Sequence, residues 1–304
     1  MSTIRRALTG ASGQPELVFR RRYPGTVAEL REACTDPARL ARWFGTVHGA
    51  PAAVGDAFTA ELSENPTDVA EGAVRRCAPD LLEVSWSWQG EPESVITARF
   101  APDGDGAVLT LHHALAQTEH AAGYGGGWEQ ALQALARVLG VAEPDAPADE
   151  DIEAEAARRW RLLVSSPAEL VLDLPASPAR VWGAFADAES LALWWWAHWD
   201  DVEITADVRE GGSFRFHVPS QGIELHGTYL RVIERERLAF TWQWRDADGE
   251  VPDESADLRF EAIDGGTRLT VRHSGPWTDE RPATNYLMGW EFTLDQLRQQ
   301  LSDH

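Results

Sequence analysis

Cysteine is scarce in this chain of 304 residues, which contains only Cys34 and Cys77. The two lie far apart and form no CxxC pair. The sequence therefore excludes a disulfide scaffold and a zinc framework, and it favours a reducing compartment. An HExxH motif, a GxSxG nucleophile elbow and a ligand-like spacing of histidines are missing as well. We therefore expect no bound metal and no cofactor.

Basic residues and long apolar runs are also few. The chain has 27 Lys and Arg against 49 Asp and Glu, a formal net charge of −22, and such a surface repels nucleic acid and anionic membranes. The amino-terminal segment has no apolar run of signal-peptide length, and the most apolar stretch, 191–199, is too short to span a bilayer. We therefore expect a soluble, cytoplasmic protein that neither binds nucleic acid nor inserts into a membrane.

What the chain does contain is an internal repeat. The Trp-Ser-Trp motif at 86–88 recurs as Trp-Gln-Trp at 242–244, and Gly-Trp-Glu at 127–129 recurs at 289–291. Further blocks repeat in the same order at a nearly constant offset, which indicates a tandem duplication. Two copies exclude a solenoid, so each copy should be a complete domain.

The composition places the join between the copies at 141–167. We expect a first domain at 15–140 and a second at 168–304, with residues 1–14 as a loose tail. The join begins with a stretch rich in Pro, Ala and Asp, which is typical of a linker. A short helix capped by Asp149 should follow, because acidic residues precede arginines there, as the helix dipole prefers.

Within each copy the pattern predicts a strand, short helices, an antiparallel meander and a long closing helix. In the second copy, 170–174 is strand-like, and Ser177 and Pro178 begin a helix. Short alternating runs separated by turns follow, and apolar residues from Tyr286 to Leu301 then fall on one helical stripe. This order predicts the α+β class.

The second copy resembles the Hsp90-ATPase-activator-like branch of the START/Bet v 1 helix-grip superfamily. The resemblance covers nearly all of 168–302 and rests on the stretches PASPARVWGAFADAESLALWW, GGSFRF, HGTYLRVIERERLAFTWQW, GGTRLTVRHSG and YLMGWEFTLDQL. The first copy is similar but more divergent, with RRYPGTVAELREACTD in place of the PxxPxxVW opening and GDAFTA in place of GGSFRF.

The resemblance implies two tandem helix-grip domains. Each would be a curved antiparallel sheet wrapped around a long carboxy-terminal helix, with two short helices and a cavity between sheet and helix. Members of the superfamily bind lipids, sterols or polyketides, and some cyclise aromatic polyketides. One related group confers self-resistance to enediyne antibiotics, and the eukaryotic namesakes stimulate Hsp90. Fold analogy alone selects none of these roles.

Period-two alternation places two tryptophans and a histidine on the apolar face of each sheet. In the second copy these are Trp242, Trp244 and His273, and the closing helix adds Tyr286 and Trp290 at i and i+4. The candidate ligand-binding residues are Trp43, Phe58, Trp86, Trp88, Phe100, His113, Tyr124, Trp128, Trp195, Phe214, Phe216, Trp242, Trp244, Phe260, His273, Tyr286 and Trp290. We favour an aromatic cage for a flat, mostly apolar ligand, and a plain aromatic core is the alternative interpretation.

Catalytic signals are weak. The candidates for proton transfer are His113, His273, Tyr124 and Tyr286, although a lone histidine on an apolar face is more often held structurally. The glycine-rich segment 123–127 resembles a phosphate cradle but lacks the following Lys-Ser/Thr. In LALWWWAHW (191–199) consecutive tryptophans should not all face inward, so at least one should lie on the surface or at a cavity mouth.

We therefore expect each domain to bind a hydrophobic or aromatic small molecule in an internal cavity. The role could be sequestration of, or self-resistance to, a polyketide or enediyne-type product. A polyketide aromatase/cyclase is the first alternative, and an Hsp90-type chaperone regulator is the second. The ligand and the oligomeric state are left open by the sequence.

Overall fold

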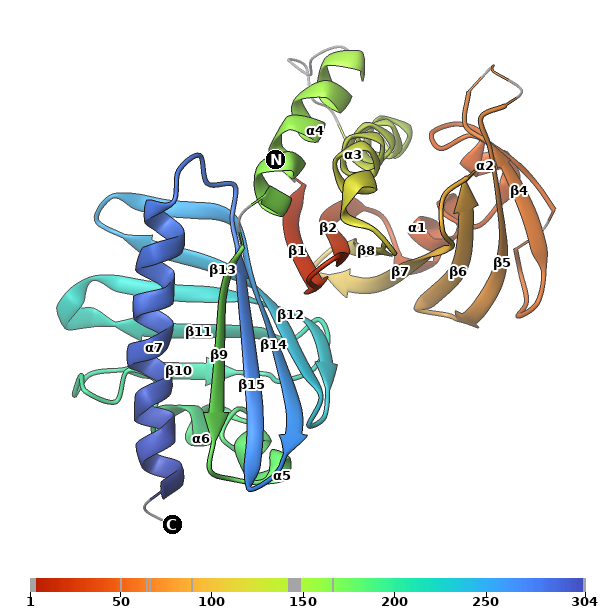
Figure 1. Ribbon diagram of the computed structural model, residues 1–304. Coiled ribbons are helices and arrows are strands. Elements are labelled where there is room, and N and C mark those ends of the chain that lie inside the picture. Colours follow the sequence, from red (N-terminus) through yellow and green to blue (C-terminus); the bar gives the residue numbers. More distant parts are fainter. Residues whose placement is uncertain are drawn as a thin grey trace. The chain divides into compact units, whose positions relative to one another are not determined.

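The computed structural model describes residues 4–49, 51–63, 65, 67–88, 90–141, 149–165 and 167–302. The chain divides into two compact units. Most of the first runs over Gly10–Val164 and most of the second over Ser165–His304. Each unit combines one sheet with at least one long helix, which confirms the expected α+β class and the pair of helix-grip domains (Figure 1).

The first unit contains an eight-stranded sheet. In spatial order its strands are β1 (Arg5–Ala11), β2 (Gln14–Pro24), β8 (Gly106–Ala114), β7 (Ser94–Asp103), β6 (Leu81–Trp88), β5 (Val69–Ala78), β4 (Ala57–Glu61) and β3 (Thr46–His48). Two short helices, α1 (Val27–Ala33) and α2 (Pro37–Leu40), follow β2, and η1 (Thr118–His120) leads into the long α3 (Ala121–Val138). A capping box between Thr26 and Glu29 begins α1.

The second unit contains a seven-stranded antiparallel sheet. Its spatial order is β10 (Glu203–Ala206), β11 (Ser213–Val218), β12 (Ile223–Ile233), β13 (Arg237–Asp246), β14 (Gly249–Ile263), β15 (Gly266–Ser274) and β9 (Ala168–Leu174). The helices are α5 (Pro178–Gly183), α6 (Ala188–Ala192), η2 (Pro219–Gln221) and the long α7 (Arg281–Ser302).

The core of the second unit follows the predicted periodicities. Leu238, Phe240 and Trp242 alternate along β13 and are buried. On α7 the buried stripe consists of Trp290, Thr293, Leu294, Leu297 and Leu301, so this helix lays its apolar face on the sheet. The sequence alternation therefore positions the tryptophans of β13 and α7 toward one another.

The amino terminus departs from the sequence prediction. Residues 5–11, expected to be part of a loose tail, form β1 at the edge of the first sheet, next to β2. Ala7, Leu8 and Thr9 are buried. The expectation was wrong because the segment is too short and too mixed to show a pattern by itself, whereas β2 supplies its hydrogen-bonding edge.

The helix expected in the join is present as α4 (Asp149–Ser165) and belongs to the first unit. Trp160 is fully buried, its ring lies 4.9 Å from that of Phe19, and its Nε1–H donates to Glu129 Oε1 at 2.8 Å. The first unit thus extends beyond the expected boundary at 140, because α4 covers part of its apolar surface. Residues 142–148 and the capping side chain of Asp149 lie outside the described part.

The glycine-rich start of α3 is explained by helix packing. A Cβ at Gly125 would overlap the Trp160 ring, and one at Gly126 would lie 2.7 Å from the Glu153 carbonyl oxygen. Gly125 and Gly126 therefore let α3 and α4 approach closely, which accounts for these two glycines without a phosphate.

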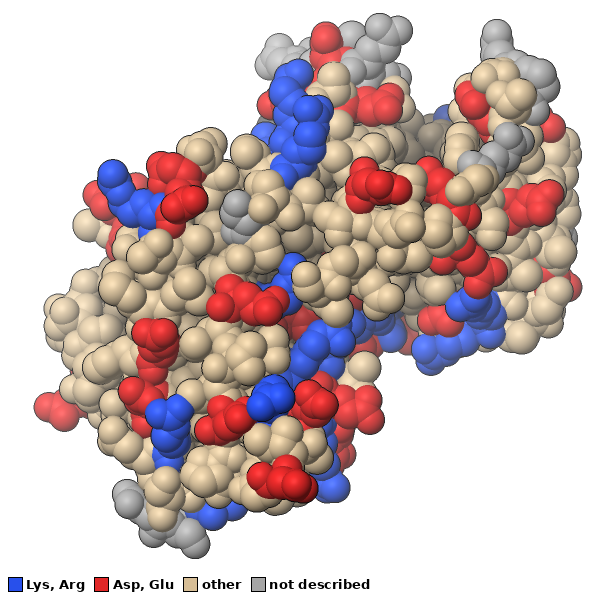
Figure 2. Space-filling view, in the orientation of Figure 1, with Lys and Arg blue, Asp and Glu red and all other residues tan. Residues whose placement is uncertain are grey.

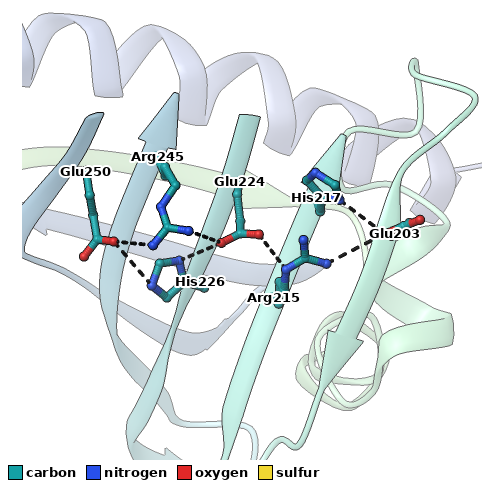
Figure 3. Close-up of polar contacts among 7 residues, drawn as sticks. All are labelled: Glu203, Arg215, His217, Glu224, His226, Arg245 and Glu250. Atoms are coloured by element: carbon teal, nitrogen blue, oxygen red, sulfur yellow. Dashed lines mark hydrogen bonds and ion pairs between the residues drawn. The ribbon is translucent and has the colours of Figure 1, made fainter. Parts of the chain in front are cut away.

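Most charged side chains lie on the outer faces. On the face shown in Figure 2, carboxylates and guanidinium groups are interspersed rather than gathered into one patch. Figure 3 shows the outward residues of β10–β14, where Arg215 pairs with Glu224 at 2.6 Å and Arg245 with Glu250 at 2.7 Å. Both arginines are about half exposed, so each pair is individually weak, as is typical of a surface. Within the described ranges, no helix has the length and apolar character to cross a membrane.

Candidate functional site

The second unit contains a cavity of about 740 Å³ between its sheet and α7. Its walls are largely aromatic, and the tryptophans that line it are Trp195, Trp196, Trp199, Trp242, Trp244, Trp277 and Trp290. The meander supplies two of these through the alternation of β13, and α7 supplies one from its buried stripe. The remaining four come from the segments that follow α6 and β15.

The segment after α6 places more tryptophans in the interior than the sequence predicted. Trp194, Trp195 and Trp196 are consecutive and are exposed by only 0%, 2% and 8%. All three are buried because the chain leaves the helix after Ala192, and Trp196 takes a left-handed conformation with φ of 57°. A non-glycine residue in this region is strained, and such strain concentrates at functional sites.

Glu254 on β14 is the carboxylate in the wall of this cavity. Its side chain accepts a hydrogen bond from Tyr286 Oη at 2.6 Å and another from Trp277 Nε1 at 2.7 Å, and the residue is only 1% exposed. Burial raises the pKa of this carboxyl to about 7, although both hydrogen bonds act to lower it. The same burial, together with Glu254, raises the pKa of the Tyr286 phenol. The pair therefore combines a neutral phenol with a carboxyl that ionises near neutrality.

The two histidines singled out in the sequence each contact a tryptophan of a long helix. Trp290 Nε1–H donates to His273 Nδ1 at 3.1 Å, and Trp128 Nε1–H donates to His113 Nδ1 at 3.0 Å. Both histidines are fully buried, and burial lowers the pKa of each to about 3. They are therefore neutral at pH 7 and orient the tryptophans of the long helices.

The first unit has a second cavity, of about 610 Å³. Trp86, Trp88, Tyr124 and Trp128 line it, and Tyr124 Oη donates to Glu91 at 2.7 Å. The arrangement repeats the phenol–carboxylate pair of the second unit. Here, however, the carboxylate comes from the β6–β7 loop.

Several predicted residues lie in the interior rather than at a large cavity. In the second unit, Phe214 and Phe216 border a void of only about 10 Å³, and in the first Phe58 borders one of about 80 Å³. Phe100, Phe260, His113 and His273 are buried and line none of these spaces. The candidate residues that line the two large cavities are Trp43, Trp86, Trp88, Tyr124, Trp128, Trp195, Trp242, Trp244, Tyr286 and Trp290.

The sequence reasoning missed Glu254, Trp277 and Glu91. A signal for Glu254 was present, since period-two alternation along β14 places it on the same face as Ala256, Leu258 and Phe260. Trp277 and Glu91 lie in loops, where no periodicity assigns a direction. Within the described residues, no group of three or more His, Cys, Asp and Glu side chains is placed to hold a metal ion.

Comparison with known proteins agrees with this architecture. The family model described as "Activator of Hsp90 ATPase homolog 1-like protein" matches residues 26–140 and 175–302. The chain belongs to this family. One matched segment falls in each unit and includes most of its sheet and its long helix, so the tandem arrangement is a repeat of one family fold, a fold that binds hydrophobic ligands. Among curated proteins, none matches this chain.

Solved structures include similar chains. The crystal structure of CalU16 from Micromonospora echinospora is 32% identical, with 55% of this chain and 98% of that one covered and a TM-score of 0.44. DynU16, described as a protein in the dynemicin biosynthetic locus, is 21% identical, with 94% and 98% covered and a TM-score of 0.38. A protein from Rhizobium leguminosarum is 24% identical, with 46% and 97% covered and a TM-score of 0.39.

Proposed function

We propose that the protein binds a flat, largely hydrophobic small molecule in the cavity of each unit. The observation that carries the proposal is the cavity of about 740 Å³ walled by tryptophans in the second unit. Ligand sites typically measure roughly 300–1,000 Å³ and combine apolar walls with a few polar groups. Tryptophan rings offer large rigid faces, which suit a planar ring system.

The polar groups of the second cavity indicate an oxygenated ligand. Trp195 lines the cavity, and its buried Nε1–H has no acceptor among the described residues. A buried donor without a partner costs free energy, and a carbonyl oxygen of a ligand would satisfy it. An aromatic polyketide carries such carbonyls on a planar frame. We therefore propose sequestration of, or self-resistance to, a polyketide or enediyne-type product as the biological role.

Binding rather than turnover is supported by the state of the two histidines. Each accepts a tryptophan N–H, is neutral at pH 7 and lines neither large cavity. A cyclase that used them as bases would need them to reach the substrate.

The test uses 1,8-dihydroxyanthraquinone as a planar, oxygenated probe, with binding followed by calorimetry. Trp195→Phe removes the unpaired donor from the cavity wall. The matched control is Trp194→Phe, which changes the neighbouring buried residue outside the cavity lining. We expect about a fivefold to tenfold weaker Kd for Trp195→Phe, as loss of a hydrogen bond of about 1 kcal/mol predicts, and less than a twofold change for Trp194→Phe. Absence of probe binding, or equal effects of the two changes, contradicts the proposal.

A further inference from the structure

We infer that the second cavity selects ligands that carry a cationic ammonium group beside a planar apolar ring system, with Glu254 as the counter-ion. The inference rests on the proposed function and names its substrate class. It follows from the juxtaposition of one buried carboxylate with several aromatic faces.

The carboxylate of Glu254 is desolvated without a charged partner. Its two hydrogen-bond donors, Tyr286 Oη and Trp277 Nε1, are neutral groups. Among the described residues, no ion pair joins it to an arginine or a histidine. A buried charge without a counter-charge is costly, so a site of this kind gains most from a ligand that brings the opposite charge.

The aromatic rings around the carboxylate favour the same kind of ligand. The Trp277 ring stacks on Tyr286 at 5.6 Å, and Trp242 lies 5.9 Å from Tyr286 and 5.2 Å from Trp290 between ring centroids. The faces of such rings are electronegative and attract ammonium groups. Because the rings are apolar as well, they accept an alkylated ammonium more readily than a strongly hydrated cation.

The first unit provides an internal comparison. Strand register pairs Glu254 with Trp242 and, in the first unit, Ser94 with Trp86, so the two residues occupy equivalent positions. Ser94 is uncharged, and its Oγ accepts a hydrogen bond from His113 Nε2 at 2.9 Å, so no buried carboxylate occupies this position. Three carboxylates line the first cavity, and all are partly or fully solvated. Glu91 is 23% exposed and lies 3.1 Å from His120, and Glu119 and Glu153 are exposed. The selectivity for cations therefore belongs to the second cavity.

The other titratable and charged groups around the cavity differ from Glu254 in their protonation or exposure. On α7 these are Arg281, which is exposed at the cavity, and Tyr286, which stays neutral. His273 on β15 stays neutral, and His198 lines the cavity from the segment after α6. Asp246, at the end of β13, accepts from Trp244 Nε1. The pKa of Glu254 is about 7, so its charge, and with it the attraction for a cation, grows as the pH rises through neutrality.

The experiment compares two probes of equal shape, 2-naphthyltrimethylammonium and 2-tert-butylnaphthalene. The charge on the first is permanent, so only the protein titrates. In the full chain at pH 8.5 we expect the cation to bind at least tenfold more tightly than its neutral isostere. At pH 5.5 the two should bind within about twofold of each other. Glu254→Gln keeps the shape and an acceptor for Tyr286, and it should bind the two probes within about twofold of each other at pH 8.5 as well as at pH 5.5. Glu91→Gln, the matched change in the first unit, should leave it intact.

The outcomes separate the two proposals. If neither probe binds, the proposed function fails and this inference fails with it. If both bind equally at pH 8.5, the cavity binds aromatic ligands but the assignment of a cation site is overturned. A preference that survives Glu254→Gln also overturns it, because the counter-ion then lies elsewhere. Circular dichroism of each variant verifies that the fold is retained.

Discussion

Gly125 and Gly127 lie on the same helix, α3, and an alanine at each position should have different effects on stability. At Gly127 no heavy atom lies within 4 Å of an added Cβ, whereas at Gly125 the Cβ would overlap the Trp160 ring. Trp160 is fully buried and held by Glu129, so its ring cannot move aside cheaply. The same substitution on one helix thus tests whether the glycines serve helix packing.

The magnitude follows from two terms. Replacing glycine by alanine inside a helix stabilises by about 1 kcal/mol, and this gain applies to both variants. Overpacking a tight interior costs about 1–3 kcal/mol and applies to Gly125→Ala alone. The difference between the two variants therefore isolates the steric cost. Gly127→Ala should be more stable than the parent by about 1 kcal/mol, and Gly125→Ala less stable than Gly127→Ala by about 1–3 kcal/mol.

Urea denaturation followed by circular dichroism measures both free energies of unfolding. The reasoning is refuted if Gly125→Ala is as stable as Gly127→Ala, because the close approach of α3 and α4 would then not depend on the missing Cβ. Equal stabilisation of both variants would also reopen the interpretation of 123–127 as a phosphate-binding segment.

Two further predictions concern the polar groups of the second unit. The pKa of Glu254 is raised from 4.5 to about 7 on folding, so its contribution to stability is full below pH 4.5 and is lost as the pH rises through 7. Relative to Glu254→Gln, the parent chain should lose about 3 kcal/mol of unfolding free energy between pH 4 and pH 8.5. Urea denaturation at both pH values measures this loss. A difference between the two proteins that stays constant with pH would contradict the prediction. Trp290→Phe removes the donor to His273 and should lower the unfolding free energy by about 1–3 kcal/mol. Phe292 is exposed, so the control variant Phe292→Leu should change the unfolding free energy by less than about 0.5 kcal/mol. Equal effects in thermal melts would show that the Trp290–His273 hydrogen bond does not contribute.

The elements could be predicted from the sequence because their signals are local. The alternation of Leu238, Phe240 and Trp242 follows from the pleat of a strand, and the stripe on α7 follows from the helical period. The repeated motifs showed that the same fold occurs twice. Alternation along β13 also predicts an inward, buried Trp244. The strand register shifts between Trp242 and Trp244, and Trp244 is only half-buried.

The site depended on contacts between segments far apart in the chain. Glu254 is hydrogen-bonded to Trp277 and Tyr286 because β14, the loop after β15 and α7 pack together. No local sequence pattern predicts these contacts. The burial of three consecutive tryptophans required a left-handed residue at Trp196. The edge position of β1 likewise depended on a neighbouring strand.

The sequence by itself determined the α+β class, the duplication and the inward face of most strands and of both long helices, because each of these is encoded by the periodicity of residues close together in the chain. Only the tertiary structure decided which aromatic side chains fill the interior and which line a cavity. Phe214 and Trp242 illustrate this, since both face inward but only the tryptophan borders the large space. A cavity is the volume that remains after all elements have packed, so it depends on the positions of every wall at once.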